Sequence, residues 1–185
     1  MAKVILINGS PRAEGCTFTA LSEVASTLGK AGIETEIIQA TLVKEDADRA
    51  AEKVIAADGL VLGSPVYYAS ASGLATWFFD ELFNRISGKV RFKPGAAVVS
   101  CRRGGASSTF EQINKYFTIS EMPVVSSNYW NQVHGNTPDE VRKDLEGMQT
   151  MRLLGENMAY LIRCIEKAGI PFPEKEERVR TNFIR

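Results

Sequence analysis

The sequence predicts an α/β protein in which helices cover both faces of a parallel β-sheet. Strand-like and helix-like segments alternate along the 185 residues, which is typical of parallel sheets with helical crossovers. Three strand-like segments are continuously apolar, as expected of strands buried on both faces; they are residues 4–7, 60–62 and 96–99. A loop rich in glycine and serine follows each of them, which predicts ligand-binding loops at one edge of the sheet.

The elements of the first half follow from their hydrophobic periodicity. After the strand at 4–7, the pattern predicts a helix beginning near Thr17, and glycines at 29 and 32 end it. Residues 33–38 alternate between apolar and polar, as in a strand with one exposed side. An alanine-rich surface helix is expected over 46–57, and the apolar strand at 60–62 is expected to end at Gly63-Ser64-Pro65.

The second half continues the alternation. Large apolar residues at helical spacing predict a helix over 72–86, and the strand at 96–99 precedes a helix at 109–117. A fifth strand is expected at 123–126. Pro138 is expected to begin one long helix that runs to about Ala168, where Gly169 ends it.

Composition and charge exclude several classes of protein. Hydrophobic residues make up 44% of the chain, and 22 basic residues balance 22 acidic ones, so charge favours neither a nucleic acid nor a membrane partner. No apolar run approaches the ~20 residues of a membrane helix. Lys3 leads directly into a strand without the apolar region of a signal peptide, so a cytoplasmic protein is expected.

Cysteine and histidine content limits metal and disulfide chemistry. The three cysteines, Cys16, Cys101 and Cys164, are widely spaced and form no Cys-x-x-Cys pair. This pattern argues against a disulfide framework, a zinc site and an iron–sulfur cluster. His134 is the only histidine, so a histidine-rich metal site is excluded as well.

The loop at residues 8–17 is predicted to bind a phosphate. A strand, a loop of small residues and a helix start direct unpaired backbone N–H groups at one point, and Ser10, Arg12 and Thr17 add side-chain donors. The P-loop motif is not met, because Gly9 and Gly15 are one residue too far apart and Cys16 occupies the lysine position. The dinucleotide fingerprint is not met either, because Pro11 follows Gly9 two positions later.

Three loops together resemble a known family. The motifs are Asn8-Gly9-Ser10-Pro11-Arg12 with Gly15-Cys16-Thr17, Gly63-Ser64-Pro65-Val66-Tyr67-Tyr68, and the Gly104-Gly105 loop. In this combination they resemble the NADPH-dependent FMN reductases of the flavodoxin-like superfamily. The resemblance implies a flavodoxin-like three-layer sandwich with a five-stranded parallel sheet of order 2-1-3-4-5. It implies an FMN-binding domain over residues 1–170 and a C-terminal tail over 171–185.

Within that family, the pattern is similar to the iron–sulfur flavoproteins and their cluster-free relatives. The cluster-binding members carry a compact cysteine motif between the second strand and the next helix. Residues 39–58 of this chain contain no cysteine, so the chain resembles a cluster-free member.

The resemblance implies the following FMN contacts. The first loop would hold the phosphate through Ser10, Arg12, Gly15, Cys16 and Thr17; Cys16 stands where many relatives have asparagine. The second loop would lie along the flavin ring through Pro65, Val66, Tyr67 and Tyr68. The third would meet the pyrimidine edge of the ring through Cys101, Arg102, Arg103, Gly104 and Gly105.

The function implied is that of an FMN-dependent NAD(P)H oxidoreductase. NADPH or NADH would give hydride to the flavin, and a small acceptor such as a quinone or a free flavin would take it, so no catalytic side chain is required. The alternative is a flavodoxin-type electron carrier, which balanced charge and the Arg102-Arg103 pair argue against. A cysteine phosphatase is excluded, because neither Cys16 nor Cys101 begins a Cys-x5-Arg motif.

Several roles have two or more interpretations. Tyr67 and Tyr68 either line the flavin or cap the sheet, and Arg102 and Arg103 face the flavin, the NADPH phosphates or solvent. Trp130 belongs to the substrate pocket or to a subunit interface, and His134 is expected to be a loop residue without a catalytic role. Cys16 is either a passive residue or a thiol with a lowered pKa. The apolar tail favours packing on a partner subunit in a homodimer or homotetramer.

Overall fold

The computed structural model describes residues 1–181 and 183. Five parallel strands form its sheet in the order β2-β1-β3-β5-β6: β1 (Lys3–Asn8), β2 (Glu34–Gln39), β3 (Gly59–Tyr67), β5 (Gly95–Cys101) and β6 (Gln132–His134). A two-residue strand, β4 (Ser70–Ala71), pairs antiparallel with the end of β3. Without β4 in the count, the predicted order 2-1-3-4-5 is confirmed.

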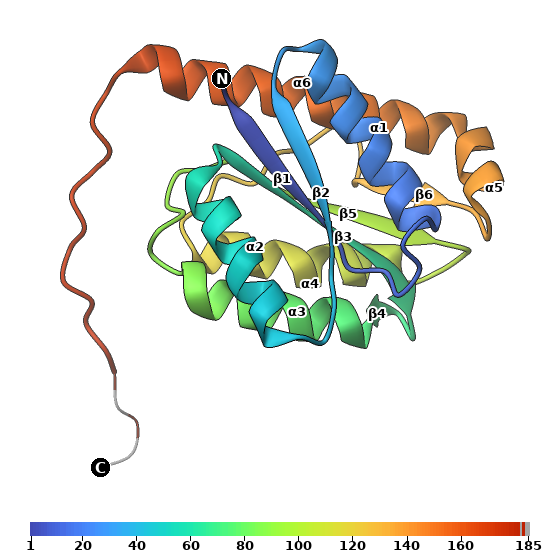
Figure 1. The fold of residues 1–185 in the computed structure, drawn as a ribbon, viewed down its shortest axis with the longest axis horizontal. Coiled ribbons are helices and arrows are strands. Elements are labelled where there is room, and N and C mark those ends of the chain that lie inside the picture. Colours follow the sequence, from blue (N-terminus) through green and yellow to red (C-terminus); the bar gives the residue numbers. More distant parts are fainter. Residues whose placement is uncertain (182, 184–185) are drawn as a thin grey trace.

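Helices cover the two faces of this sheet in separate layers (Figure 1). One layer contains α2 (Lys44–Ala56), α3 (Gly73–Ile86) and α4 (Ala106–Ile119). The other contains α1 (Cys16–Lys30), α5 (Pro138–Lys143) and α6 (Leu145–Ala168). The molecule therefore has the three-layer architecture that the alternating pattern predicts.

The apolar strands are buried on both faces, as predicted. In β1, Val4 and Leu6 pack in the core under α1 and α6, whereas Ile5 and Ile7 pack in the core under α2 and α3. All four side chains have 0% exposure. This arrangement aligns the carboxyl ends of β1, β3, β5 and β6 along one edge of the sheet.

The predicted fifth strand is in the wrong place. Residues 123–126 contribute only an isolated bridge between Val124 and Gly95, and Pro123 has no N–H to extend a ladder. The strand that completes the sheet is β6, which pairs with the end of β5 through Val99, Ser100 and Cys101. The loop after the last strand therefore begins at Gly135, later than the sequence pattern indicated.

The predicted long helix is broken into α5 and α6 at Asp144. The Asp144 carboxylate accepts hydrogen bonds from the backbone N–H of Gly147 at 3.0 Å and of His134 at 2.6 Å. An aspartate that caps a helix start in this way replaces continuous helix by a turn. The caps at the two ends agree with the sequence, because Thr137 caps α5 and Gly169 ends α6 with φ 58°.

Strand β3 runs past its predicted end. Gly63, Ser64 and Pro65 continue the ladder with β5, opposite Val98, Val99 and Ser100. Beyond Gly63 the other side of β3 is no longer paired with β1, so the missing N–H of Pro65 is tolerated there. The strand consequently carries residues 65–67 out to the edge of the sheet.

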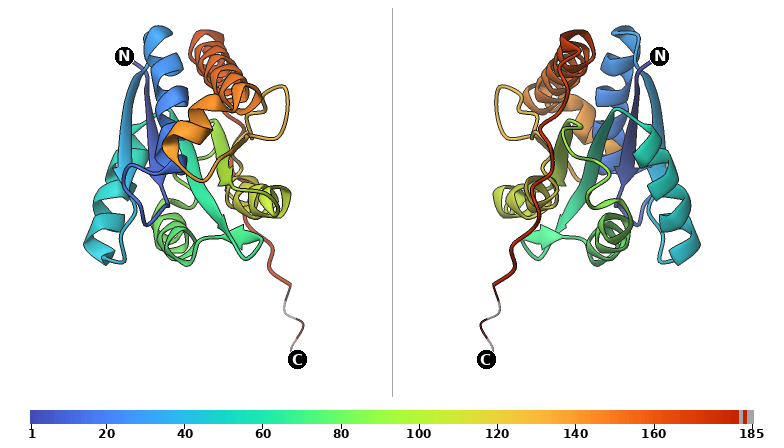
Figure 2. Two further views of the ribbon diagram at one scale, coloured as in Figure 1. Left: turned by 90° about the vertical axis from the view of Figure 1, so that its right-hand side faces the viewer. Right: turned by 90° about the vertical axis from the view of Figure 1, so that its left-hand side faces the viewer.

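After α6 the chain forms an extended arm, which we define as residues 170–181. Figure 2 shows it crossing the edge of the body where the strands begin. Residues 182, 184 and 185, on which part of the tail prediction rests, lie outside the described residues. Across the described helices, none combines the length and apolar character needed to cross a membrane.

Candidate functional site

The first loop, between β1 and α1, is held in shape by two buried or half-buried amides. The Asn8 side chain donates to the Ala13 carbonyl at 3.1 Å and accepts from the Ser10 N–H at 3.2 Å. Gln39, at the end of β2, accepts from Asn8 at 2.7 Å and donates to the Ser10 carbonyl at 2.7 Å. The two side chains therefore fix the path of the loop from both sides.

This loop presents several donors that the described residues leave uncommitted. Helix α1 has Gly15 at its N-cap and no side-chain cap, so no capping side chain occupies the N–H groups of its first turn. Arg12 is exposed and takes part in none of the ion pairs of the described residues. Thr17 is partly committed, because its hydroxyl and that of Ser100 on β5 hydrogen-bond to each other at 2.8 Å, which leaves one of the two protons for a ligand. These groups together suit a phosphate-sized anion.

The second loop is a tight hairpin between β3 and β4. Its two central residues, Tyr68 and Ala69, both have left-handed backbone, with φ 52° and 57°, as in the turns that match the twist of paired strands. Helix α4 holds the hairpin, because Gln112 accepts from Ser70 at 2.7 Å and Ser108 donates to Ala69 at 2.6 Å. The hairpin is thus a fixed wall at the edge of the sheet.

The third loop, between β5 and α4, packs directly against this hairpin. Gly105 has φ 92°, and a Cβ there would lie 2.6 Å from the Cα of Ala69, so only glycine permits the approach. Gly105 is also the N-cap of α4, which again has no side-chain cap. Arg102 belongs to no ion pair of the described residues either.

The loops enclose a cavity of about 280 Å³ at the carboxyl edge of the sheet, which we call the carboxyl-edge cavity. Eight of the predicted site residues line it: Ser10, Arg12, Cys16, Thr17, Pro65, Val66, Tyr67 and Arg102. Six predicted residues lie outside its lining: Gly15, Tyr68, Cys101, Arg103, Gly104 and Gly105. Three lining residues were not predicted: Ser100, Gly135 and Asn136.

Gly135 and Asn136 were missed because the fifth strand was expected too early. They directly follow β6, in register with the end of β5, where Cys101 pairs with His134. The signal that marks them is Thr137-Pro138, a helix start that requires a loop immediately before it. Asn136 is held through its backbone N–H, which donates to Glu140 at 2.6 Å.

Cys16 is a half-buried thiol whose pKa is raised above its ordinary value. Burial raises its pKa, and the nearby positive charge of Arg12 offsets only part of that effect. The thiol donates weakly to the Gly135 carbonyl at 3.7 Å. The interpretation of Cys16 as a thiol with a lowered pKa is therefore wrong.

Trp130 and His134 lie outside the lining of the carboxyl-edge cavity. Trp130 is 49% exposed and packs on Tyr129, with 4.7 Å between the ring centroids. The His134 ring nitrogen lies 3.4 Å from the Gln132 side-chain nitrogen. The geometry gives neither residue a place among the groups that line the cavity.

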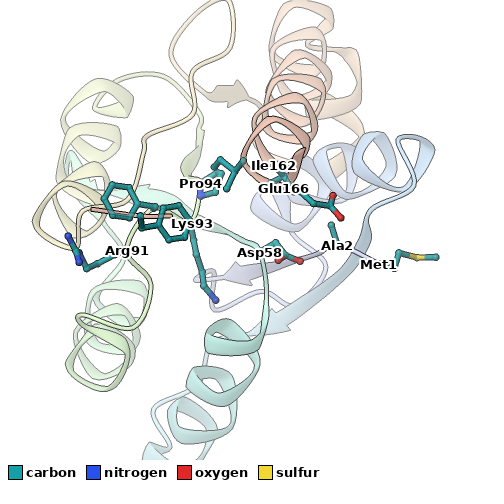
Figure 3. A pocket seen from close by; sticks show the side chains of 11 residues that line it. Met1, Ala2, Asp58, Arg91, Lys93, Pro94, Ile162 and Glu166 are labelled. Carbon is teal, nitrogen blue, oxygen red and sulfur yellow. The ribbon is translucent and has the colours of Figure 1, made fainter. Parts of the chain in front are cut away.

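A second cavity, of about 380 Å³, lies at the opposite edge of the sheet; we call it the amino-edge cavity. Figure 3 shows Pro94 beside Ile162 of α6, with Asp58, Lys93 and Glu166 around them. Its polar groups are mostly engaged: Lys93 donates to the carbonyls of Val54, Ile55 and Ala57 at the end of α2. This cavity is larger than the carboxyl-edge cavity, but its lysine is already hydrogen-bonded and has little to offer a ligand.

The residues of the carboxyl-edge cavity fit a phosphate-bearing ring. The α1 start and Arg12 would hold the phosphate, and residues 65–67 provide a wall for a planar ring. An iron–sulfur cluster does not fit. The three cysteines lie on α1, β5 and α6, and no group of three or more metal-binding side chains comes together within residues 1–181 and 183.

Sequence comparison relates the chain to flavoproteins. The family model described as NADPH-dependent FMN reductase matches residues 2–137. An iron–sulfur flavoprotein of Methanocaldococcus jannaschii is 34% identical over 192 residues, covering 89% of this chain and 100% of the relative.

Structural comparison finds the same fold in flavin-related proteins. The structure of RosB with bound 8-demethyl-8-formylriboflavin-5′-phosphate has a TM-score of 0.76 at 14% identity, covering 99% of this chain and 92% of that one. A flavodoxin, WrbA-like protein from Agrobacterium tumefaciens has a TM-score of 0.69 at 18% identity, covering 88% and 98%. At these identities the likeness establishes the flavodoxin-like fold alone.

Proposed function

The chain belongs to the NADPH-dependent FMN reductase family, and from that premise we propose that it is an FMN-dependent NAD(P)H oxidoreductase acting on a small electron acceptor. Family membership supports a flavin-binding oxidoreductase. The electron donor and the acceptor, a quinone, a free flavin or a similar molecule, are part of the proposal.

The observation that carries the proposal is the combination of uncommitted anion donors and an apolar wall in one cavity. The uncapped start of α1 and the unpaired Arg12 guanidinium would bind the FMN phosphate. The Thr17 and Ser100 hydroxyls hydrogen-bond to each other at 2.8 Å, so the one that accepts in this pair would donate its proton to the same phosphate.

The remaining lining residues would orient the ring. Pro65, Val66 and Tyr67 form the wall on which it would lie, and the contact of Gly105 with Ala69 fixes the wall in place. Bound FMN would supply the hydride chemistry between NADPH or NADH and the acceptor. The chain's own residues would therefore bind and position the flavin and its substrates rather than donate protons. His134 lies outside the lining of the cavity.

Arg102 and Arg103 would have different roles. Both side chains are exposed, but Arg102 lines the carboxyl-edge cavity whereas Arg103 lies outside its lining. The positive charge of Arg102 would favour a reduced, anionic ring over the neutral oxidised one and so raise the two-electron reduction potential. Of the three partners considered for this pair, namely the flavin, the NADPH phosphates and solvent, we propose that Arg102 faces the flavin and that Arg103 faces solvent.

The test is the visible spectrum of the purified protein with FMN under argon, before and after NADPH or NADH is added, followed by a quinone. We expect the protein to retain FMN, to lose the oxidised flavin band with the dinucleotide, and to regain it with the quinone. Bound FMN that neither dinucleotide reduces would instead support the electron-carrier alternative. A protein that takes up no FMN would contradict both functions.

A further inference from the structure

The arm, residues 170–181, is an extended segment that makes no hydrogen bond to the body within the described residues and contacts it through Phe172. Every residue in it is exposed. Within the described residues, its backbone makes no hydrogen bond and its charged side chains form no ion pair. Unpaired N–H and C=O groups along an extended segment are a template for pairing with another chain.

Local chemistry stiffens the arm before any partner binds. Pro171 and Pro173 fix their own φ angles and favour extended backbone at Ile170 and Phe172. Phe172 stacks on Phe92, with 4.8 Å between centroids and 12° between the ring planes. Phe92 itself has left-handed backbone, with φ 63°. A segment that is already ordered loses less entropy when it pairs.

Residues 174–179 of the arm line an open hollow. The hollow measures about 560 Å³ and lies between residues 174–179 and the ends of α3 and α4. Val179, on this stretch, is 89% exposed. The arm, which runs across the amino edge of the sheet (Figure 2), therefore keeps its side chains exposed and, within the described residues, its backbone without hydrogen bonds.

The charges of the arm are complementary to those of a second, antiparallel copy. If Glu176 lies opposite Glu176 of that copy, Lys175 faces Glu177, Glu174 faces Arg178, and Phe172 faces Arg180. Opposite charges directly across an antiparallel pair stabilise it, and an arginine over an aromatic ring does so as well. Each of these pairs occurs twice, as two-fold symmetry requires.

The prolines fit the same register. In antiparallel strands, residues alternate between pairs that exchange backbone hydrogen bonds and pairs that do not. Pro171 and Pro173 both occupy odd positions, whereas Phe172, Glu174 and Glu176 occupy even ones. When the even positions form the hydrogen-bonded pairs, both prolines fall in the other pairs, which need no backbone N–H donor toward the partner strand.

We propose that residues 172–180 of two copies of this chain pair antiparallel about a two-fold axis at Glu176, and that this pairing forms a homodimer contact. The arm lies at the sheet edge opposite to the carboxyl-edge cavity, so the contact is independent of flavin binding. Because a two-stranded pair by itself is marginal, the arms provide a weak dimer that depends on protein concentration.

Two variants with the same composition and net charge test the register. Exchanging Glu174 and Arg178 (Glu174→Arg with Arg178→Glu) keeps every opposite-charge pair. Exchanging Glu174 and Lys175 (Glu174→Lys with Lys175→Glu) places like charges opposite each other at all four positions. Sedimentation velocity over a range of protein concentrations gives the dimer dissociation constant of each.

We expect the first exchange to leave the dissociation constant within threefold of the unmodified chain and the second to raise it at least tenfold. Glu176→Gln removes the like charges on the axis and should lower it several-fold. A chain that ends at Gly169 should lose this association while its FMN affinity stays the same. Equal dissociation constants for the two exchanges, or an unmodified chain that is monomeric throughout, would overturn the proposal.

Discussion

The two edges of the sheet carry different cavities: the larger one has cations that are already hydrogen-bonded, and the smaller one has arginines without ion pairs among the described residues. The amino-edge cavity is the larger, about 380 Å³ against about 280 Å³. Yet its cations are committed: Lys93 donates to three carbonyls and Arg91 pairs with Glu121. At the carboxyl edge, Arg12 and Arg102 have no such partners among the described residues.

The difference shows why volume alone does not identify a binding site. A charged group that already has its hydrogen bonds gains little from a ligand, because any new contact replaces an existing one. An uncommitted arginine beside an uncapped helix gains a full charge-assisted interaction. The smaller cavity is therefore the one to which the proposed function assigns the FMN phosphate.

The largest effect is expected from removing the uncommitted charge of Arg12. Arg12→Gln deletes a charge-assisted contact worth about 1.5–3 kcal/mol, so FMN affinity should fall roughly 10- to 100-fold. The matched control is Arg91→Gln at the amino edge, which should leave FMN affinity unchanged. Isothermal titration with FMN measures both, and equal losses in the two variants would remove the distinction between the edges.

A change at the amino edge should affect stability instead. Lys93→Met keeps the aliphatic stem but leaves the carbonyls of Ile55 and Ala57 without their donor, whereas the Val54 carbonyl still accepts from the Ala57 N–H. We expect the free energy of unfolding to fall by about 2 kcal/mol, with FMN affinity within twofold of the unmodified chain. Urea unfolding checks the first value, and a loss of FMN binding at unchanged stability would contradict the structural role.

A smaller effect is expected from the amide that shapes the first loop. Gln39→Leu removes the bonds from Gln39 to Asn8 and to the Ser10 carbonyl, so the loop should lose order and FMN affinity should fall about tenfold. Gln39→Glu retains the acceptor for Asn8 and should lose less. If FMN binds the two variants as tightly as the unmodified chain, the loop does not depend on this amide.

The smallest change is expected at Cys16. Cys16→Asn introduces an amide donor in the cavity lining and should tighten FMN binding two- to fivefold, the effect of one neutral hydrogen bond. Cys16→Ala should stay within twofold, because the half-buried thiol donates only weakly to the Gly135 carbonyl. A large loss in Cys16→Ala would show that the thiol has a role the geometry does not explain.

Most of the fold follows from local patterns in the sequence. Continuous apolar runs, such as the one that contains Ile5 and Leu6, identified the central strands as buried on both faces. The alternation of strands and helices identified the parallel sheet. The errors came from tertiary effects. Asp144 divides a continuous helical pattern because it bonds to His134, ten residues away. Residues 132–134 form a strand because the end of β5 is there to pair with them.

The site was predictable where its chemistry lies within one loop. Ser10 and Arg12 lie in the loop before α1, Cys16 and Thr17 are the first two residues of α1, and all four line the cavity. Ser100 and Asn136 join them only through strand register, and Gln39 acts through side-chain bonds across two strands. Such contacts depend on three-dimensional pairing, which one sequence does not specify.

The most direct test of the central claim compares FMN with riboflavin, which has the same ring but no phosphate. If the carboxyl-edge cavity recognises the phosphate through Arg12 and the start of α1, FMN should bind at least 100-fold more tightly than riboflavin to the unmodified chain. The ratio should fall at least tenfold in Arg12→Gln. Equal affinities for the two ligands, or a ratio that Arg12→Gln leaves unchanged, would contradict the account.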